Sequence, residues 1–60
     1  MNIQKYRKEK GMTVQQLADA AGISKRTLED IIRRDDCLIS NAAKIAAALD
    51  VTLDELYKTE

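Results

Sequence analysis

The residues best suited to binding an anion lie in the segment 24–34, which reads SKRTLEDIIRR. A helix turns by about 100° per residue, so this segment would gather Thr27, Leu28, Ile31 and Ile32 on one side. The opposite side would carry Lys25, Arg26, Glu29, Asp30 and Arg33. Ammonium and guanidinium groups donate hydrogen bonds to anions and to acceptor atoms, and a carboxylate accepts them. The segment is therefore a candidate binding helix with one face for the core and one for a ligand.

The same spacing also fits an ordinary solvated helix. The pairs Lys25–Glu29, Arg26–Asp30 and Glu29–Arg33 are all placed for ion pairs along one helix. Each such pair contributes only about 0.2–0.5 kcal/mol, which would not hold an arginine back from a phosphate. Both interpretations stay open on the sequence alone.

Catalytic chemistry finds little support in this chain. It contains no histidine and a single cysteine, Cys37, and no cluster with the spacing of metal ligands. A nucleophilic thiol needs a base or a cationic neighbour, so we interpret Cys37 as a bystander. We expect no enzyme activity, no cofactor, no bound metal and no small-molecule ligand.

Two short helices joined by a tight turn position the candidate residues. Thr13 and Gln16 have the spacing of a capping box for a helix from Thr13 to about Ala21. Ser24 predicts the cap of the next helix, from Ser24 to about Arg33. Gly22 lies between them, where the backbone must turn in the left-handed conformation that glycine adopts without strain.

Three further helices are expected around this pair. Residues 2–10 predict a first helix that ends at Gly11. Leu38 and Ile39 are expected to fill the core beneath the turn that follows Arg34. Ser40 predicts the cap of a fourth helix that runs through Leu49, and Thr52 with Glu55 forms a capping box for a fifth.

These features resemble a known family. Leu17-Ala18, Ala21-Gly22-Ile23, Leu28 and Ile31 are similar to the helix-turn-helix of the phage Cro and repressor type, often named the XRE-type family. The flanking stretches YRKEKGMT and AKIAAALDVTLDELY resemble the family's first and its fourth and fifth helices. The resemblance implies an all-α fold, a compact five-helix bundle of the lambda-repressor-like class with a central helix-turn-helix.

The resemblance also implies which residues bind double-stranded DNA. The start of the helix from Ser24 would enter the major groove, with Lys25, Arg26 and Asp30 in base-facing positions. Arg33 and Arg34 would contact phosphates at the edge of the groove. Gln15 is either a backbone contact or an ordinary exposed residue. Ser40 and Asn41 either mark a helix start that offers N–H groups to a phosphate or form a simple cap.

Three positions depart from the family pattern. Val14 stands where many members have a glutamine that contacts the DNA backbone, and valine cannot donate a hydrogen bond. Ile32 stands where a glutamate would pair with Arg7, so Arg7 is expected to find Glu29, a phosphate or water. The turn Asp35-Asp36 replaces a glycine-containing, often basic turn and brings negative charge close to the expected DNA backbone.

The charges are unevenly distributed although the net charge is zero. Residues 1–34 carry eight Lys or Arg and four Asp or Glu, a net +4, and residues 35–60 carry two and six, a net −4. Chance can produce such a difference in a short chain, but here the basic half coincides with the helix-turn-helix. Sixty residues predict one domain, 1–60. With neither a signal peptide nor an apolar stretch of about 20 residues, we expect a cytoplasmic protein.

Two functions follow as hypotheses. The first is a sequence-specific DNA-binding transcriptional regulator, repressor-like, that acts as a homodimer with Tyr57 as a participant in the contact. The alternative is a protein-interaction module, antitoxin-like or a co-regulator, on the same fold with weakened DNA contacts. Val14, Ile32 and the Asp35-Asp36 turn favour the alternative.

Overall fold

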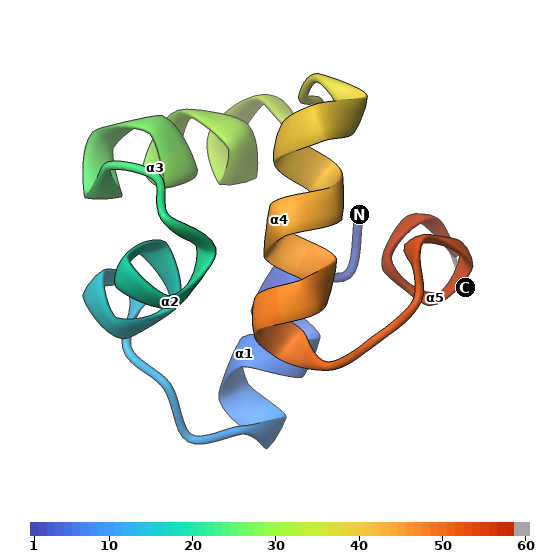
Figure 1. The fold of residues 1–60 in the computed structure, drawn as a ribbon, viewed down its shortest axis with the longest axis horizontal. Helices are drawn as coiled ribbons and strands as arrows, with labels where there is room; N and C mark the ends of the chain where they lie inside the picture. The colour runs from blue at the N-terminus through green and yellow to red at the C-terminus, as the bar shows by residue number, and fades with distance from the viewer. Residues whose placement is uncertain (59–60) are drawn as a thin grey trace.

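Helices form all the regular secondary structure of residues 1–58, the part of the chain that the structure, a computed structural model, describes. They are α1 (Ile3–Glu9), α2 (Val14–Ala21), α3 (Lys25–Arg34), α4 (Ile39–Leu49) and α5 (Leu53–Tyr57). The all-α, five-helix interpretation of the sequence is thus confirmed, and Figure 1 shows the helices wrapped around α4.

Local side-chain caps set the starts of three helices as the sequence predicts. The Thr13 hydroxyl accepts a hydrogen bond from the Gln16 N–H (3.1 Å), and the Gln16 side chain accepts one from the Thr13 N–H (2.8 Å). Thr52 and Glu55 form the same reciprocal pair at α5. Ser24 caps α3 through the Thr27 N–H (3.0 Å). These caps satisfy N–H groups that have no partner within the helix.

The core is built from small and branched side chains around α4. This helix packs on α1, α2 and α5, and α3 packs on α2. Five leucine or isoleucine side chains have no exposed surface: Leu17, Leu28, Ile45, Leu49 and Leu56. Ala18, Ala42 and Ala46 lie among them and let the helices approach closely. Leu28, together with Ile31, joins the outward-facing helix α3 to this core.

Three helices end in the left-handed conformation. Gly22 ends α2 with φ 72°, as the turn between α2 and α3 requires. Asp35 and Asp50 end α3 and α4 with φ 56° and 57°, at positions where glycine is the usual residue. At Asp50 the left-handed conformation strains the backbone, because Asp carries a Cβ atom that glycine lacks.

Replacing Asp50 with glycine is therefore expected to stabilise the domain by about 0.5–1 kcal/mol. The substitution relieves the left-handed strain and removes a negative charge from the carboxyl end of α4. It loses only a long, exposed ion pair to Lys10 (3.9 Å), which contributes little. Thermal denaturation should show a midpoint several degrees higher, since 1 kcal/mol corresponds to about 4–8 °C in a domain of this size. Asp50→Ala, which keeps the Cβ atom, is the control and should give no such rise.

The start of α4 corrects two predictions. The helix begins at Ile39 with Leu38 as the N-cap residue, so Ser40 lies inside the first turn and is not the cap. Leu38 and Ile39 do not fill the core, because they are 72% and 67% exposed. The first turn of α4 lies at the upper edge of the molecule in Figure 1. The buried part of this helix begins one turn later, with Ala42 and Ile45.

Arg7 also differs from its prediction. Its Nη1 donates to the Met12 carbonyl (2.7 Å) and its Nε to Oε1 of Gln4 (2.6 Å). Arg7 thereby fixes the connection between α1 and α2, and its partners within residues 1–58 are Gln4 and Met12, not Glu29. A backbone carbonyl five residues ahead in the chain was not among the partners considered, because its position depends on how the connection folds back.

Candidate nucleic-acid interface

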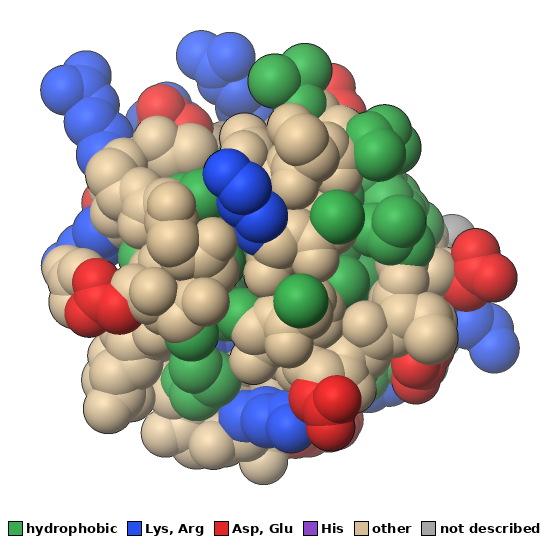
Figure 2. Space-filling view, viewed as in Figure 1, with side chains coloured by type: hydrophobic (Ala, Val, Ile, Leu, Met, Phe, Trp, Pro, Cys, Tyr) green, Lys and Arg blue, Asp and Glu red, His purple; other side chains and the backbone are tan. Residues whose placement is uncertain are grey.

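Helix α3 lies across the upper side of the molecule, with only its inner face in the core (Figure 1). Leu28 and Ile31 are buried, and Thr27 and Ile32 are half-buried beside them. Basic side chains project from the surface above it in Figure 2. The predicted division of this helix into a core face and a charged outer face is therefore present in the fold.

Lys25 and Arg26 occupy the first turn of α3, and both are exposed. Within residues 1–58 neither side chain forms an ion pair or a hydrogen bond, so neither is held by Glu29 or Asp30. The two cations are thus available to a ligand that approaches the start of α3. A helix start also contributes the positive end of the helix dipole, which favours an anionic partner.

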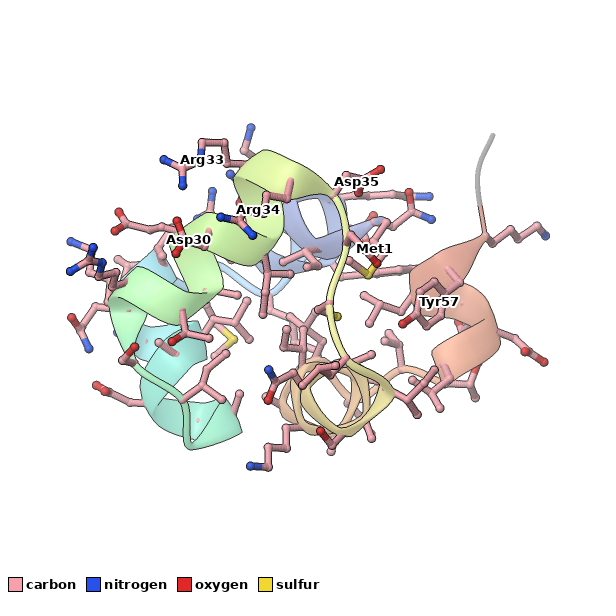
Figure 3. All side chains as sticks on the ribbon, turned by 90° about the horizontal axis from the view of Figure 1, so that it is seen from above. Met1, Asp30, Arg33, Arg34, Asp35 and Tyr57 are labelled. Carbon is pink, nitrogen blue, oxygen red and sulfur yellow. The ribbon has the colours of Figure 1, made fainter. Side chains whose placement is uncertain are left out.

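Asp30, Arg33 and Arg34 lie further along the same helix, as Figure 3 shows from above. Asp30 and Arg33 form an ion pair one turn apart, with Arg33 72% and Asp30 42% exposed. This ion pair holds the Arg33 guanidinium over the outer face of α3. The Asp30 carboxylate, which was predicted to face a base, is bound to Arg33 instead. Arg34 is exposed and is not paired with another residue of the described chain.

Gln15 and Ser24 both have partners within their own helices. The Gln15 amide donates to Oδ1 of Asp19 (2.9 Å), which places a carboxylate beside it. The Ser24 hydroxyl accepts from the Thr27 N–H and donates to Oγ1 of Thr27 (2.8 Å). Ser24 therefore acts as a cap in this structure, and one amide hydrogen of Gln15 remains for another partner.

Ser40 and Asn41 lie in the first turn of α4, which has no side-chain cap. The first N–H that bonds back along this helix is that of Ala42, to the Leu38 carbonyl (2.9 Å). The N–H groups of residues 39–41 therefore have no acceptor within the helix, as is general for a helix start. Residues 35–38 alone separate this open end from the end of α3, and Figure 1 shows the two ends near each other.

Cys37 lies half-buried in the connection between α3 and α4. Burial raises the pKa of its thiol, and the negative charge of Asp36 raises it further, although the Tyr57 hydroxyl and the chain's amino terminus oppose this. A raised pKa lowers the fraction of thiolate at neutral pH, so the structure agrees with the interpretation of Cys37 as a bystander. Within residues 1–58 we find no pocket and no group of acidic, Cys or His residues arranged to hold a metal.

One exposed apolar surface was missed in the sequence. Leu38 and Ile39 were assigned to the core because they are large and apolar, yet they are exposed beside Tyr57, which is 39% exposed. The sequence does hold an indication of this exposure, because no turn-forming residue separates Leu38 and Ile39 from the helix that follows. Leu38 is itself the N-cap, so the helix starts too early for these side chains to point inward.

Together, a glycine turn between two capped helices and an exposed cationic second helix define a helix-turn-helix protein. A family model described as helix-turn-helix matches residues 3–56, and the chain belongs to that family. The chain is similar to the HTH-type transcriptional regulator SinR of Bacillus subtilis (strain 168), with 41% identity over 64 residues. That match covers 97% of this chain and 58% of SinR, so the chain spans little more than half of its relative's length. No solved structure was found to match.

None of the helices in the described part of the chain combines the length and the apolar character that crossing a membrane requires. The longest, α4, has 11 residues, and a span needs about 20.

Proposed function

We propose that this chain binds double-stranded DNA and regulates transcription, with the start of α3 in the major groove. The observation that carries the proposal is the exposure of Lys25 and Arg26, unpaired, on the second helix of a helix-turn-helix. Family membership and the transcriptional regulator SinR support the same function. They do not favour the alternative of a protein-interaction module. Such a regulator would act in the cytoplasm, and its role would be binding rather than catalysis.

The roles we assign to the site residues follow from their positions. Lys25 and Arg26 would donate to the acceptor atoms of guanine in the major groove. Arg33, held by Asp30, and Arg34 would contact phosphates, which position the helix without reading sequence. The N–H groups at the start of α4, around Ser40 and Asn41, and the free amide hydrogen of Gln15 would complete the backbone contacts. Ser24 would set the orientation of this helix start.

A salt titration tests the proposal. Binding of the chain to a mixed-sequence, fluorescently labelled duplex is measured by anisotropy between about 20 and 200 mM salt. We expect log K to fall linearly with log salt, by about 0.9 for each phosphate neutralised, because binding releases counterions. Dissociation constants of roughly 10⁻⁴–10⁻⁶ M at physiological salt would fit non-specific binding. No detectable binding at 20 mM would favour the protein-interaction module instead.

A further inference from the structure

Glu29 is the carboxylate on the outer face of α3 that has no ion-pair or hydrogen-bond partner among residues 1–58. Its spacing allows ion pairs with Lys25 and Arg33, one turn to either side, yet neither pair is formed. Arg33 is bound to Asp30 instead, and Lys25 is unpaired. Glu29 is exposed, whereas Asp30 is half-buried and neutralised by its arginine. The outer face of α3 therefore presents a charged acceptor beside its cations, and this acceptor would lose its contact with water if α3 entered a groove.

We propose that Glu29 determines sequence specificity, because its carboxylate accepts a hydrogen bond from the N4 amino group of a cytosine in the major groove. The inference rests on the proposed function, in which the start of α3 enters that groove. A helix with its side chains is about 10–12 Å across, and the groove is about 12 Å wide. The outer face of α3 would then lie against the base edges, where Glu29 exchanges water for the groups that the bases present.

The base that suits a carboxylate follows from the groups that each base exposes. An ionised carboxylate only accepts hydrogen bonds, so it requires a donor. In the major groove guanine and thymine present acceptors, and adenine presents an acceptor next to its amino group. Cytosine presents its amino group alone. A base without a donor would leave Glu29 desolvated and unpaired, which is unfavourable for a charged group, so Glu29 would also act against the wrong bases.

The cation one turn before Glu29 fits the same short stretch of DNA. Guanine presents the acceptors O6 and N7, which lysine and arginine bind. Lys25 and Glu29 are one helical turn apart, which is about 6 Å along the axis of α3. Successive base pairs are about 3.4 Å apart along DNA. The cytosine that Glu29 contacts should therefore lie within about two base pairs of a guanine that Lys25 contacts.

The test compares the sequences that variants of the chain select from random duplex DNA. The unaltered chain should select cytosine at one position of its site. Glu29→Gln should select adenine there, because a glutamine amide binds both N6 and N7 of adenine. Glu29→Ala should select no particular base at that position, and both variants should keep the preference at the others. Lys25→Ala should lose a guanine within about two base pairs of it, which locates the contact.

Anisotropy titrations on the selected duplex measure the size of the effect. Replacing the cytosine–guanine pair by a thymine–adenine pair should weaken binding of the unaltered chain by about 5–150-fold. Glu29→Ala should bind the two duplexes equally. It should also bind mixed-sequence DNA more tightly than the unaltered chain does, because it carries one negative charge fewer. Circular dichroism melting curves verify that each variant folds.

Glu9→Gln is the matched control. It makes the same substitution at an exposed carboxylate of α1, the helix at the lower side of the molecule in Figure 1. This variant should select the same sequence as the unaltered chain.

Three results would overturn the inference. They are selection of the same sequence by Glu29→Gln and the unaltered chain, an equal change of preference in Glu9→Gln, and binding without any sequence preference. In each of them the chain still binds DNA, and that part of the proposed function stands. Failure of the unaltered chain to bind any duplex would overturn the proposed function, and the inference with it.

Discussion

Replacing both Lys25 and Arg26 with alanine is expected to weaken binding to a selected DNA site by about 30-fold or more. Each good contact to a base edge contributes about 1–3 kcal/mol, and two lost contacts at the low end of that range give this factor. Both side chains are exposed and unpaired in the described residues, so folding stability should change by less than about 0.5 kcal/mol. Anisotropy titrations and melting curves measure the two quantities separately.

Matched controls make this prediction specific. Lys44→Ala with Lys58→Ala removes two exposed cations from the acidic half of the chain and should change affinity much less. Arg34→Ala should weaken binding to all sequences alike and reduce the slope of log K against log salt by about 1, as expected for a phosphate contact. Equal losses from the Lys25–Arg26 and the Lys44–Lys58 pairs would contradict direct base recognition by α3.

Of the substitutions described for this chain, Leu28→Ala is expected to lower the free energy of unfolding the most. Leu28 has no exposed surface and anchors α3 to the core, and such substitutions cost about 2.7–5 kcal/mol. Typical stabilities of about 0.05–0.15 kcal/mol per residue give this chain roughly 3–9 kcal/mol in total. The variant is therefore expected to be largely or partly unfolded at 25 °C, which urea denaturation followed by circular dichroism would quantify.

Leu38→Ala is the matched control for this substitution. It is the same chemical change at a position that is 72% exposed, so it should cost no more than about 0.5 kcal/mol. A similar loss of stability from both variants would show that Leu38 is buried in solution. That result would contradict the fold at the start of α4, where Leu38 and Ile39 are exposed.

The features that the sequence predicted well are those determined by neighbouring residues. The caps at Thr13, Ser24 and Thr52 need only a partner three residues ahead, and all three are present. Gly22 was placed correctly for the same reason, because the left-handed turn is a property of one residue. The inner face of α3 followed from the helical period, since Leu28 and Ile31 are buried by the helix packed beneath them.

The errors concern features that depend on the whole fold. Leu38 and Ile39 share the helical spacing of the buried Ala42, yet no helix covers the first turn of α4. Their apolar character therefore predicted burial, although both residues lie outside the core. The partner of Arg7 depended on the path of the connection to α2. The pairing of Asp30 with Arg33, in place of Arg26, required the side-chain conformations themselves.

The position of α5 has a consequence for how the ends of the described chain behave. With five residues, α5 is too short to persist in isolation, and part of its support comes from Asn2. The Asn2 N–H donates to the Leu56 carbonyl (2.8 Å), and its side-chain amide reaches the carbonyls of Glu55 and Lys58. Shortening the chain at its beginning would thus loosen a helix more than fifty positions away. The segment around Asn2 and helix α5 therefore stabilise each other, and a substitution that removes these hydrogen bonds should loosen both.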